Sequence, residues 1–388
     1  MARALYIHWP FCASKCPYCD FNSHVRAQID IEAWRDGLLA DLRHEARQAA
    51  GSRRGKETLT SIFFGGGTPS LMPVNLVGDL LQAAEQLWGF DPGIEITLEA
   101  NPTSFEAGKF AAFAKAGINR VSIGVQSFDP QALAFLGRTH SVETAWRVIG
   151  QAQELFGRVT FDLIYALPGQ SSAAWEAQLS RALAFGTSHL SLYQLTIEPN
   201  TRFATDVRRD LFSPMDDDEA ADLFAITREL TVAAGLPAYE ISNHARPGEE
   251  SRHNLAYWRY QDYCGIGPGA HGRRGGIATT RVRKPENWIA AIRRQSHGID
   301  YTHTLSSREA AIEALLMGLR LAEGIDPGQL AARFRLPEAA LLDHRRVALY
   351  RELGFVWTRD ARLGVTPAGM PVLDSIIGEL VPAGLAAG

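Results

Sequence analysis

The sequence predicts an α/β protein in which a partial, TIM-like (β/α)6 barrel precedes a smaller, helical, winged-helix-like C-terminal domain. Two observations carry this prediction. Over roughly the first 200 residues, short β-branched or aromatic runs alternate with longer helix-period stretches, which favours parallel strands joined by helices. Beyond residue 305, helical patterns are followed by two strand-like runs, at 355–358 and 363–366, which are typical of a wing. A full barrel and a twisted open sheet stay open as alternatives.

The expected elements follow in chain order. Strands are expected at residues 5–8, 61–64, 94–98, 121–125, 159–165 and 190–196. Helices are expected at residues 31–49, 76–88, 105–116, 132–135 continuing through 142–156, and 174–185. A further helix over 216–234 leads to a strand candidate at 238–241. Residues 1–240 therefore form the first predicted domain, the partial barrel.

The remaining chain divides into two predicted regions. Residues 242–283 are rich in His, Arg, Gly and aromatic residues, so they are expected to form functional loops within a loop and linker region at 241–300. A helix is expected at 288–294, before a polar stretch. The C-terminal domain, 301–388, is expected to hold helices at 310–321, capped by Ser306 or Ser307, and at 328–334 and 338–353.

Composition limits the partners. The chain has 388 residues, of which 46% are hydrophobic and 21% charged, with a formal net charge of −4. This balance disfavours nucleic acid as a partner, since no overall basic field exists. No apolar run approaches the roughly 20 residues needed to span a bilayer. The basic clusters Arg273-Arg274 and 281–284 are expected to be solvated surface.

Three of the four cysteines lie in one C-x3-C-x2-C segment, at Cys12, Cys16 and Cys19. Three thiolates can surround one compact metal centre, but they cannot saturate an iron-sulfur cube in which each of four irons takes a ligand. One iron would stay open to a small molecule. A zinc site completed by His8 or His24 is the alternative.

Cysteine usage also indicates the compartment. An odd cluster of three, in a chain without an apolar signal stretch at its start, favours free thiols in a reducing cytoplasm over disulfides. Cys264 lies in an apolar context and is expected to be a small packed side chain.

Polar residues occur where several predicted strands end, which is where β/α barrels gather functional groups. The segment GGGTPS at 65–70 allows close backbone approach to a ligand. Glu99 and Gln126 end two further strands, and Arg138 follows in the chain. Asp162 lies within an apolar run and needs a partner, either Arg138 or a ligand hydroxyl. A purely structural ion pair is the alternative for Asp162.

The cysteine spacing, with Tyr18 before the last cysteine, resembles the signature of radical S-adenosylmethionine (radical SAM) proteins. The resemblance implies a [4Fe-4S] cluster whose open iron is chelated by SAM, which is then cleaved reductively. It further implies an incomplete six-unit barrel, and contact between GGGTPS and the SAM amino group. Carried over residue by residue, it assigns the cluster to the three cysteines and SAM to Tyr6, Tyr18, Gly66, Gly67, Thr68, Glu99, Gln126, Arg138 and Asp162.

Within that superfamily, the chain resembles oxygen-independent coproporphyrinogen III dehydrogenase and its relatives over almost its whole length. The short start before Cys12 and the sequence Cys-Asp-Phe at 19–21 resemble the haem-chaperone branch rather than the dehydrogenase. So does the HNxxYW string at 253–258. The resemblance associates this string with haem, implicating His253, Asn254, Tyr257 and Trp258.

From the residues themselves, a histidine can ligate haem iron and aromatic rings can face a porphyrin. His253 is therefore the candidate axial ligand, and Arg252, Arg273 and Arg274 are candidates for the propionates. Packing alone is the alternative for the string. The reading is a haem chaperone whose acceptors, by resemblance, are haem proteins such as respiratory enzymes. No haem donor is identified, and peripheral membrane contact stays open. The alternative is an enzyme that decarboxylates coproporphyrinogen III, so whether the chain is an enzyme is not decided.

Overall fold

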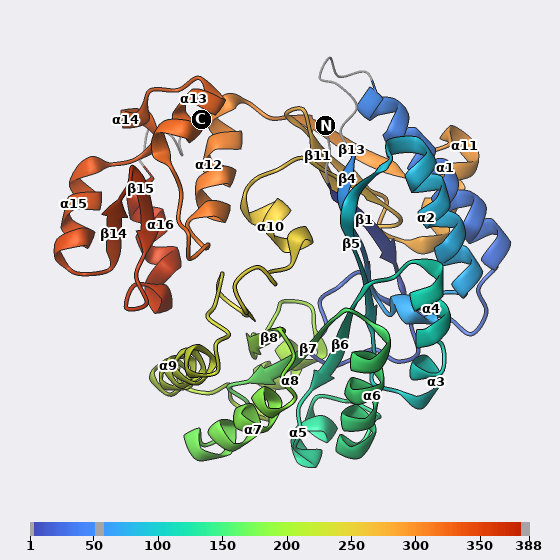
Figure 1. Ribbon diagram of the computed structural model, residues 1–388, viewed down its shortest axis with the longest axis horizontal. Coiled ribbons are helices and arrows are strands. Elements are labelled where there is room, and N and C mark those ends of the chain that lie inside the picture. Colours follow the sequence, from blue (N-terminus) through green and yellow to red (C-terminus); the bar gives the residue numbers. More distant parts are fainter. Residues whose placement is uncertain (1–3, 51–57, 382–388) are drawn as a thin grey trace.

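A single curved sheet of eleven strands dominates the structure, a computed structural model that describes residues 4–50 and 58–381 (Figure 1). Its strand order is β13-β12-β11-β10-β1-β4-β5-β6-β7-β8-β9. All six expected strands are present as parallel neighbours: β1 (Ala4–Trp9), β4 (Leu59–Gly66), β5 (Phe90–Ala100), β6 (Arg120–Gln126), β7 (Arg158–Tyr165) and β8 (His189–Gln194). Within the described residues the end strands β13 and β9 do not pair with each other. The barrel is therefore partial, as expected, and the full barrel is excluded.

Helices cover the outer face of this sheet, on the right and at the bottom of Figure 1. They are α1 (Ile31–Ala50), α2 (Val74–Trp88), α4 (Phe110–Ala116), α6 (Val142–Leu155) and α7 (Ser172–Ala184). Strand residues such as Ile62, Leu98 and Phe161 are fully buried in the core beneath them. Because the parallel strands are consecutive neighbours, their carboxyl ends meet at one edge of the sheet.

Two helices expected in the first domain are interrupted, and so is the helix expected at 338–353, which divides into α14 (Glu338–Leu341) and α15 (His344–Glu352). Residues 105–116 divide into α3 (Ser104–Ala107) and α4, and residues 132–156 divide into α5 (Pro130–Phe135) and α6. The second break occurs because Ser141 caps α6, its Oγ accepting from the Thr144 N–H at 3.2 Å. The turn between these helices carries Arg138.

The segment 242–283 was expected to form loops, and this expectation is wrong. It forms β9 (Asn243–Ala245), α10 (Arg252–Trp258), β10 (Tyr263–Ile266), β11 (His271–Arg274) and β12 (Ile277–Arg281), and β13 (Ile299–Thr304) follows. β10 pairs in parallel with β1, and β11 to β13 add antiparallel strands. Gly275 and Gly276 both have positive φ, as a two-residue hairpin turn requires. The strand expected at 238–241 is replaced by an isolated bridge between Ala238 and His244.

The basic clusters are only in part the solvated surface that was expected. Arg281 is buried and donates to Asp41 at 2.9 Å and to Glu45 at 2.5 Å, while Arg274 donates to Glu45 at 2.9 Å. Charged groups can be buried when they are paired in this way. The network ties α1 to β11 and β12. Within the clusters, Arg283 and Lys284 are exposed.

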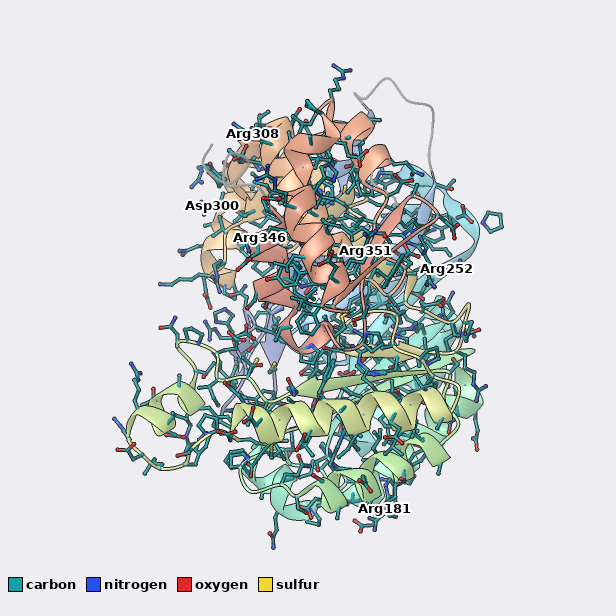
Figure 2. All side chains as sticks on the ribbon, turned by 90° about the vertical axis from the view of Figure 1, so that its left-hand side faces the viewer. Arg181, Arg252, Asp300, Arg308, Arg346 and Arg351 are labelled. Atoms are coloured by element: carbon teal, nitrogen blue, oxygen red, sulfur yellow. The ribbon has the colours of Figure 1, made fainter. Side chains whose placement is uncertain are left out.

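The C-terminal region is helical and has a hydrophobic core of its own. It holds α12 (Ser307–Gly318), α13 (Pro327–Phe334), α14 (Glu338–Leu341), α15 (His344–Glu352), the hairpin β14 (Val356–Arg359) with β15 (Arg362–Val365), and α16 (Leu373–Leu380), which was not expected. Ser306 caps α12 in a capping box with Glu309. Figure 2, in which Arg346 and Arg351 mark α15, shows this region from its outer side.

Parts of the predicted domains lie outside the described residues, namely 1–3 and 51–57 of the first and 382–388 of the last. Among the helices of the described residues, none combines the length and apolar character needed to cross a membrane.

Candidate functional site

The three clustered cysteines open onto one cavity at the carboxyl edge of the sheet. Cys12 ends β2 (Phe11–Cys12), and Cys16 and Cys19 follow in a loop that we call the cysteine loop, residues 12–23. A backbone hydrogen bond from Cys19 N–H to Cys16 C=O, 3.2 Å, closes a turn within it. The other walls come from the ends of β4, β5, β6 and β7. Burial raises the pKa of the Cys12 and Cys19 thiols, so a positively charged metal centre would be needed to hold them as thiolates.

The donor set fits an iron-sulfur cluster better than zinc. Within the described residues, no three His, Cys, Asp or Glu side chains converge as ligands of a single ion. Thiols around a shared cavity suit a cube in which separate irons each take one cysteine. The expected zinc alternatives are engaged elsewhere: His8 contacts Tyr6 Oη at 3.0 Å and Asn22 C=O at 2.9 Å, and His24 Nε2 contacts Asn22 Oδ1 at 3.2 Å.

The glycine segment after β4 runs directly against the chain that leads into Cys12. Gly67 N–H donates to Trp9 C=O at 2.7 Å, and Thr68 N–H donates to Phe11 C=O at 2.9 Å. Gly66 has φ +116°, and a Cβ there would lie 2.6 Å from the His8 ring. Only glycine fits this approach. Gly66, Gly67 and Thr68 all line the cysteine cavity, as the expectation of a ligand-facing backbone requires.

A chain of hydrogen bonds links two of the cysteines across the cavity. Arg138 Nη1 donates to Cys16 Sγ at 3.3 Å, and its Nη2 donates to Gly124 C=O at 2.7 Å and to Asn101 Oδ1. Asn101 Nδ2 donates to Thr68 Oγ1 at 3.1 Å, and Thr68 Oγ1 donates to Cys12 Sγ at 3.5 Å. Sequence reasoning missed Asn101. The available signal was a side-chain amide two residues after Glu99, before a proline at a strand end.

Among the carboxyl groups that line the same cavity are those of Glu99 and Asp162. Glu99 accepts from Gly66 N–H at 3.2 Å, and burial, followed by the nearby Asp162, raises the Glu99 pKa to about 8. Burial raises the Asp162 pKa to about 6. Arg138, one of the two partners considered for Asp162, acts on it through its charge, while the carboxylate accepts from Ser122 Oγ at 3.4 Å and lies beside Ser191. The two groups are placed to accept from ligand hydroxyls.

The remaining expected SAM residues divide between two sites. Gln126, which has φ +72°, and Tyr18 line the cysteine cavity. Tyr6 instead lines a second cavity, which adjoins the first because Phe21, Gly66 and Glu99 line both. This second cavity has a volume of about 460 Å³, and α10 and the β10–β11 turn form its far side.

The HNxxYW segment forms α10, and one of its four expected haem residues reaches the second cavity. Tyr257 lines it, whereas His253, Asn254 and Trp258 do not. His253 is 2% exposed, with Nδ1 at 3.1 Å from Ser61 Oγ and Nε2 at 2.9 Å from Tyr257 Oη. Iron ligation by His253 would require the loss of one of these bonds and exposure of the ring. The arrangement does not support His253 as the axial ligand.

The three arginines considered for propionates are engaged elsewhere. Arg252, labelled in Figure 2, donates to Gly93 C=O at 2.6 Å. Arg273 donates to Gln261 C=O at 2.9 Å and lies 3.3 Å above the Tyr260 ring centroid, and Arg274 belongs to the buried network with Glu45. Cys264 is buried in the main core, as expected.

Comparisons with known proteins find similar sequences over most of the chain. Residues 6–179 match the Radical SAM superfamily, and residues 305–372 match the HemN C-terminal domain. The chain is 38% identical to Radical S-adenosyl methionine domain-containing protein 1, mitochondrial, of Bos taurus, over 97% of this chain and 87% of that protein. It is 43% identical to the Heme chaperone HemW of Escherichia coli K12, over 74% of this chain and 75% of that protein.

Among solved structures, the coproporphyrinogen III oxidase HemN of Escherichia coli, a radical SAM enzyme, superimposes with a TM-score of 0.81 at 21% identity. The match covers 97% of this chain and 89% of that one. At this identity the likeness shows a shared fold.

Proposed function

We propose that this chain, which belongs to the HemW family of radical SAM heme chaperones, binds haem beside a [4Fe-4S] cluster and SAM and delivers the haem to acceptor proteins. The haem and the chaperone activity in this proposal come from the names of its relatives, which are called heme chaperones. The observation that carries the proposal is the pair of adjoining cavities, one lined by the three cysteines and the other by Tyr257 of the HNxxYW helix. The cysteine cavity suits the cluster and SAM, and the second cavity suits a flat ligand such as haem.

In this proposal Cys12, Cys16 and Cys19 hold the cluster. Gly66, Gly67 and Thr68 present backbone to SAM, Glu99 and Asp162 accept from its hydroxyl groups, and Gln126, Tyr18 and Arg138 complete the walls. When bound, the cluster supplies one electron to SAM. Arg138 holds Cys16 in place and puts a positive charge beside the SAM carboxylate. Tyr6 lies at the boundary with the second cavity, where its contact would be with the cargo.

We place the chain in a reducing compartment such as the cytoplasm. All four cysteines lie in the described part of the chain and are free thiols, which supports this placement. The acceptors are proposed to be haem proteins such as respiratory enzymes.

The second candidate is oxygen-independent coproporphyrinogen III dehydrogenase, which the fold shared with HemN favours. One experiment separates the two candidates. The anaerobic, reconstituted protein is incubated with SAM, reductant and coproporphyrinogen III, and in parallel it is titrated with haem. We expect a saturable Soret band and no protoporphyrinogen IX. Sustained formation of protoporphyrinogen IX without haem binding would favour the enzyme instead.

A further inference from the structure

One histidine that lines the second cavity has ring nitrogens that are available to a ligand. His271, at the start of β11, lines the cavity and is exposed. Within the described part of the chain its ring has no hydrogen-bond or ion-pair partner. The two other histidines at this place have both ring nitrogens occupied, His8 by Tyr6 and Asn22, and His253 by Ser61 and Tyr257. Partial desolvation of the ring at the cavity wall, followed by the charges of Arg283 and Arg281, lowers the pKa of His271, which favours the neutral, ligating form.

Two aromatic rings line the same cavity as this imidazole. Tyr257 and Tyr263 both line the cavity, with ring centroids 4.5 Å apart and planes at 86°. Tyr257 is fixed by its hydrogen bond to His253, and Tyr263 lies 5.6 Å from the Arg273 guanidinium group. Aromatic rings held rigidly in this way suit contact with a porphyrin.

A free positive charge lies on the rim. Arg283 lines the cavity, is exposed, and forms no ion pair within the described residues. Its position is set through its backbone, since Asn22 Nδ2 donates to Arg283 C=O and to Pro268 C=O, each at 2.9 Å. A guanidinium group there can form charge-assisted hydrogen bonds with a carboxylate.

Asn22 also joins this rim to the cysteine loop. A Cβ at Gly269, which has φ +77°, would lie 2.6 Å from Asn22 Nδ2, so the close packing depends on glycine. The wall that carries His271 and the loop that carries the cysteines are therefore held as one unit.

We propose that the second cavity is the haem site, with the His271 imidazole as an axial ligand of the iron, Tyr257 and Tyr263 against the porphyrin, and Arg283 on a propionate. The inference rests on the proposed function. In it, His253 is a positioning residue that holds Tyr257 and does not touch the iron.

The test is a haem titration of the full chain with its cluster reconstituted, followed by visible absorption and electron paramagnetic resonance. We expect His271→Ala to weaken haem binding at least tenfold and to lose the imidazole-ligated spectrum, and added imidazole to restore that spectrum. His344→Ala, which removes an exposed histidine of α15, is the matched control and should behave as wild type.

Two further variants separate the roles. His253→Ala should keep the wild-type Soret position while affinity falls through loss of the Tyr257 contact. Arg283→Gln should weaken affinity several-fold at an unchanged spectrum. A His271→Ala protein with wild-type affinity and spectrum would overturn the inference but leave the chaperone proposal standing. Absence of haem binding by the wild-type protein would overturn both.

Discussion

Arg138 Nη1 lies 3.3 Å from Cys16 Sγ, so a side chain from the turn between α5 and α6 holds the loop that carries the cysteines. The same guanidinium group is bonded to Asn101 after β5 and to the Gly124 carbonyl in β6. The cysteine loop is thereby fixed to two strand ends at once. The geometry of the cysteine loop therefore depends on the barrel as well as on the loop itself.

Replacing the clustered cysteines should abolish the cluster. We expect Cys12→Ser, Cys16→Ser and Cys19→Ser each to lose most of the iron and the charge-transfer absorption after anaerobic reconstitution, because each thiolate serves a separate iron. Cys264→Ser is the control and should retain both, because Cys264 is packed in the main core. Iron and sulfide analysis checks the result. Equal iron loss from Cys264→Ser would count against the assignment.

Replacing Arg138 should weaken SAM binding while sparing the fold. Arg138→Met removes a positive charge from the cavity and leaves Gly124 C=O and Asn101 without their donor. We expect the affinity for SAM to fall at least tenfold, which is about 1.4 kcal/mol, as measured by anaerobic calorimetry on reconstituted protein. Arg181→Met, on the exposed side of α7 (Figure 2), should bind SAM as wild type does. Wild-type affinity in Arg138→Met would contradict the proposed contact.

Glu99 should make the cofactor-free protein less stable as the pH rises. Its pKa is about 8 in the folded chain and near 4.5 when unfolded, so between these values the folded state holds the extra proton. The stabilisation is fully present below pH 4.5 and is lost as the pH rises through 8. We expect the free energy of unfolding to decrease by on the order of 5 kcal/mol over this range.

The matched variants for this prediction are Glu99→Gln, which should flatten the pH dependence, and Glu176→Gln on exposed α7, which should not. Urea denaturation at pH 5, 6.5 and 8 measures both. An identical slope in Glu99→Gln and wild type would assign the effect to other groups.

Arg281 should matter strongly for stability. Arg281→Ala leaves Asp41 and Glu45 buried without their shared cation, and we expect a loss of about 3–5 kcal/mol. Arg26→Ala breaks the exposed pair with Glu286 and should cost far less, because solvent screens that pair. Chemical denaturation compares the two variants. Similar losses in both would mean that burial of the Arg281 network contributes little.

Much of the barrel could be predicted from sequence because the patterns that indicate its strands and helices are local. The six parallel strands read as short apolar runs, and polar residues at their ends, such as Glu99 and Gln126, were predicted to face one ligand and do line one cavity. The Cys12 to Cys19 spacing is equally local.

Long-range contacts explain what the sequence did not predict. The segment that holds β10 to β12 was predicted as loops because it is rich in His, Arg, Gly and aromatic residues, whereas its Arg281 is paired with acids more than 200 positions away. The same limit applies to the HNxxYW string. The string contains a histidine and two aromatic residues, but it does not reveal that Ser61 and Tyr257 form hydrogen bonds with the two ring nitrogens of His253. His271 was not predicted as a site residue because its proposed role depends on the residues that line the same cavity in the folded chain.

Haem transfer tests the central claim most directly. The reconstituted protein is loaded with haem, mixed anaerobically with SAM and the haem-free form of a respiratory haem enzyme, and separated by size. The account predicts that haem moves to the acceptor and restores its activity, and that His271→Ala protein delivers far less. Haem that stays on the chain, or an acceptor that fills no faster than with free haem, would contradict it.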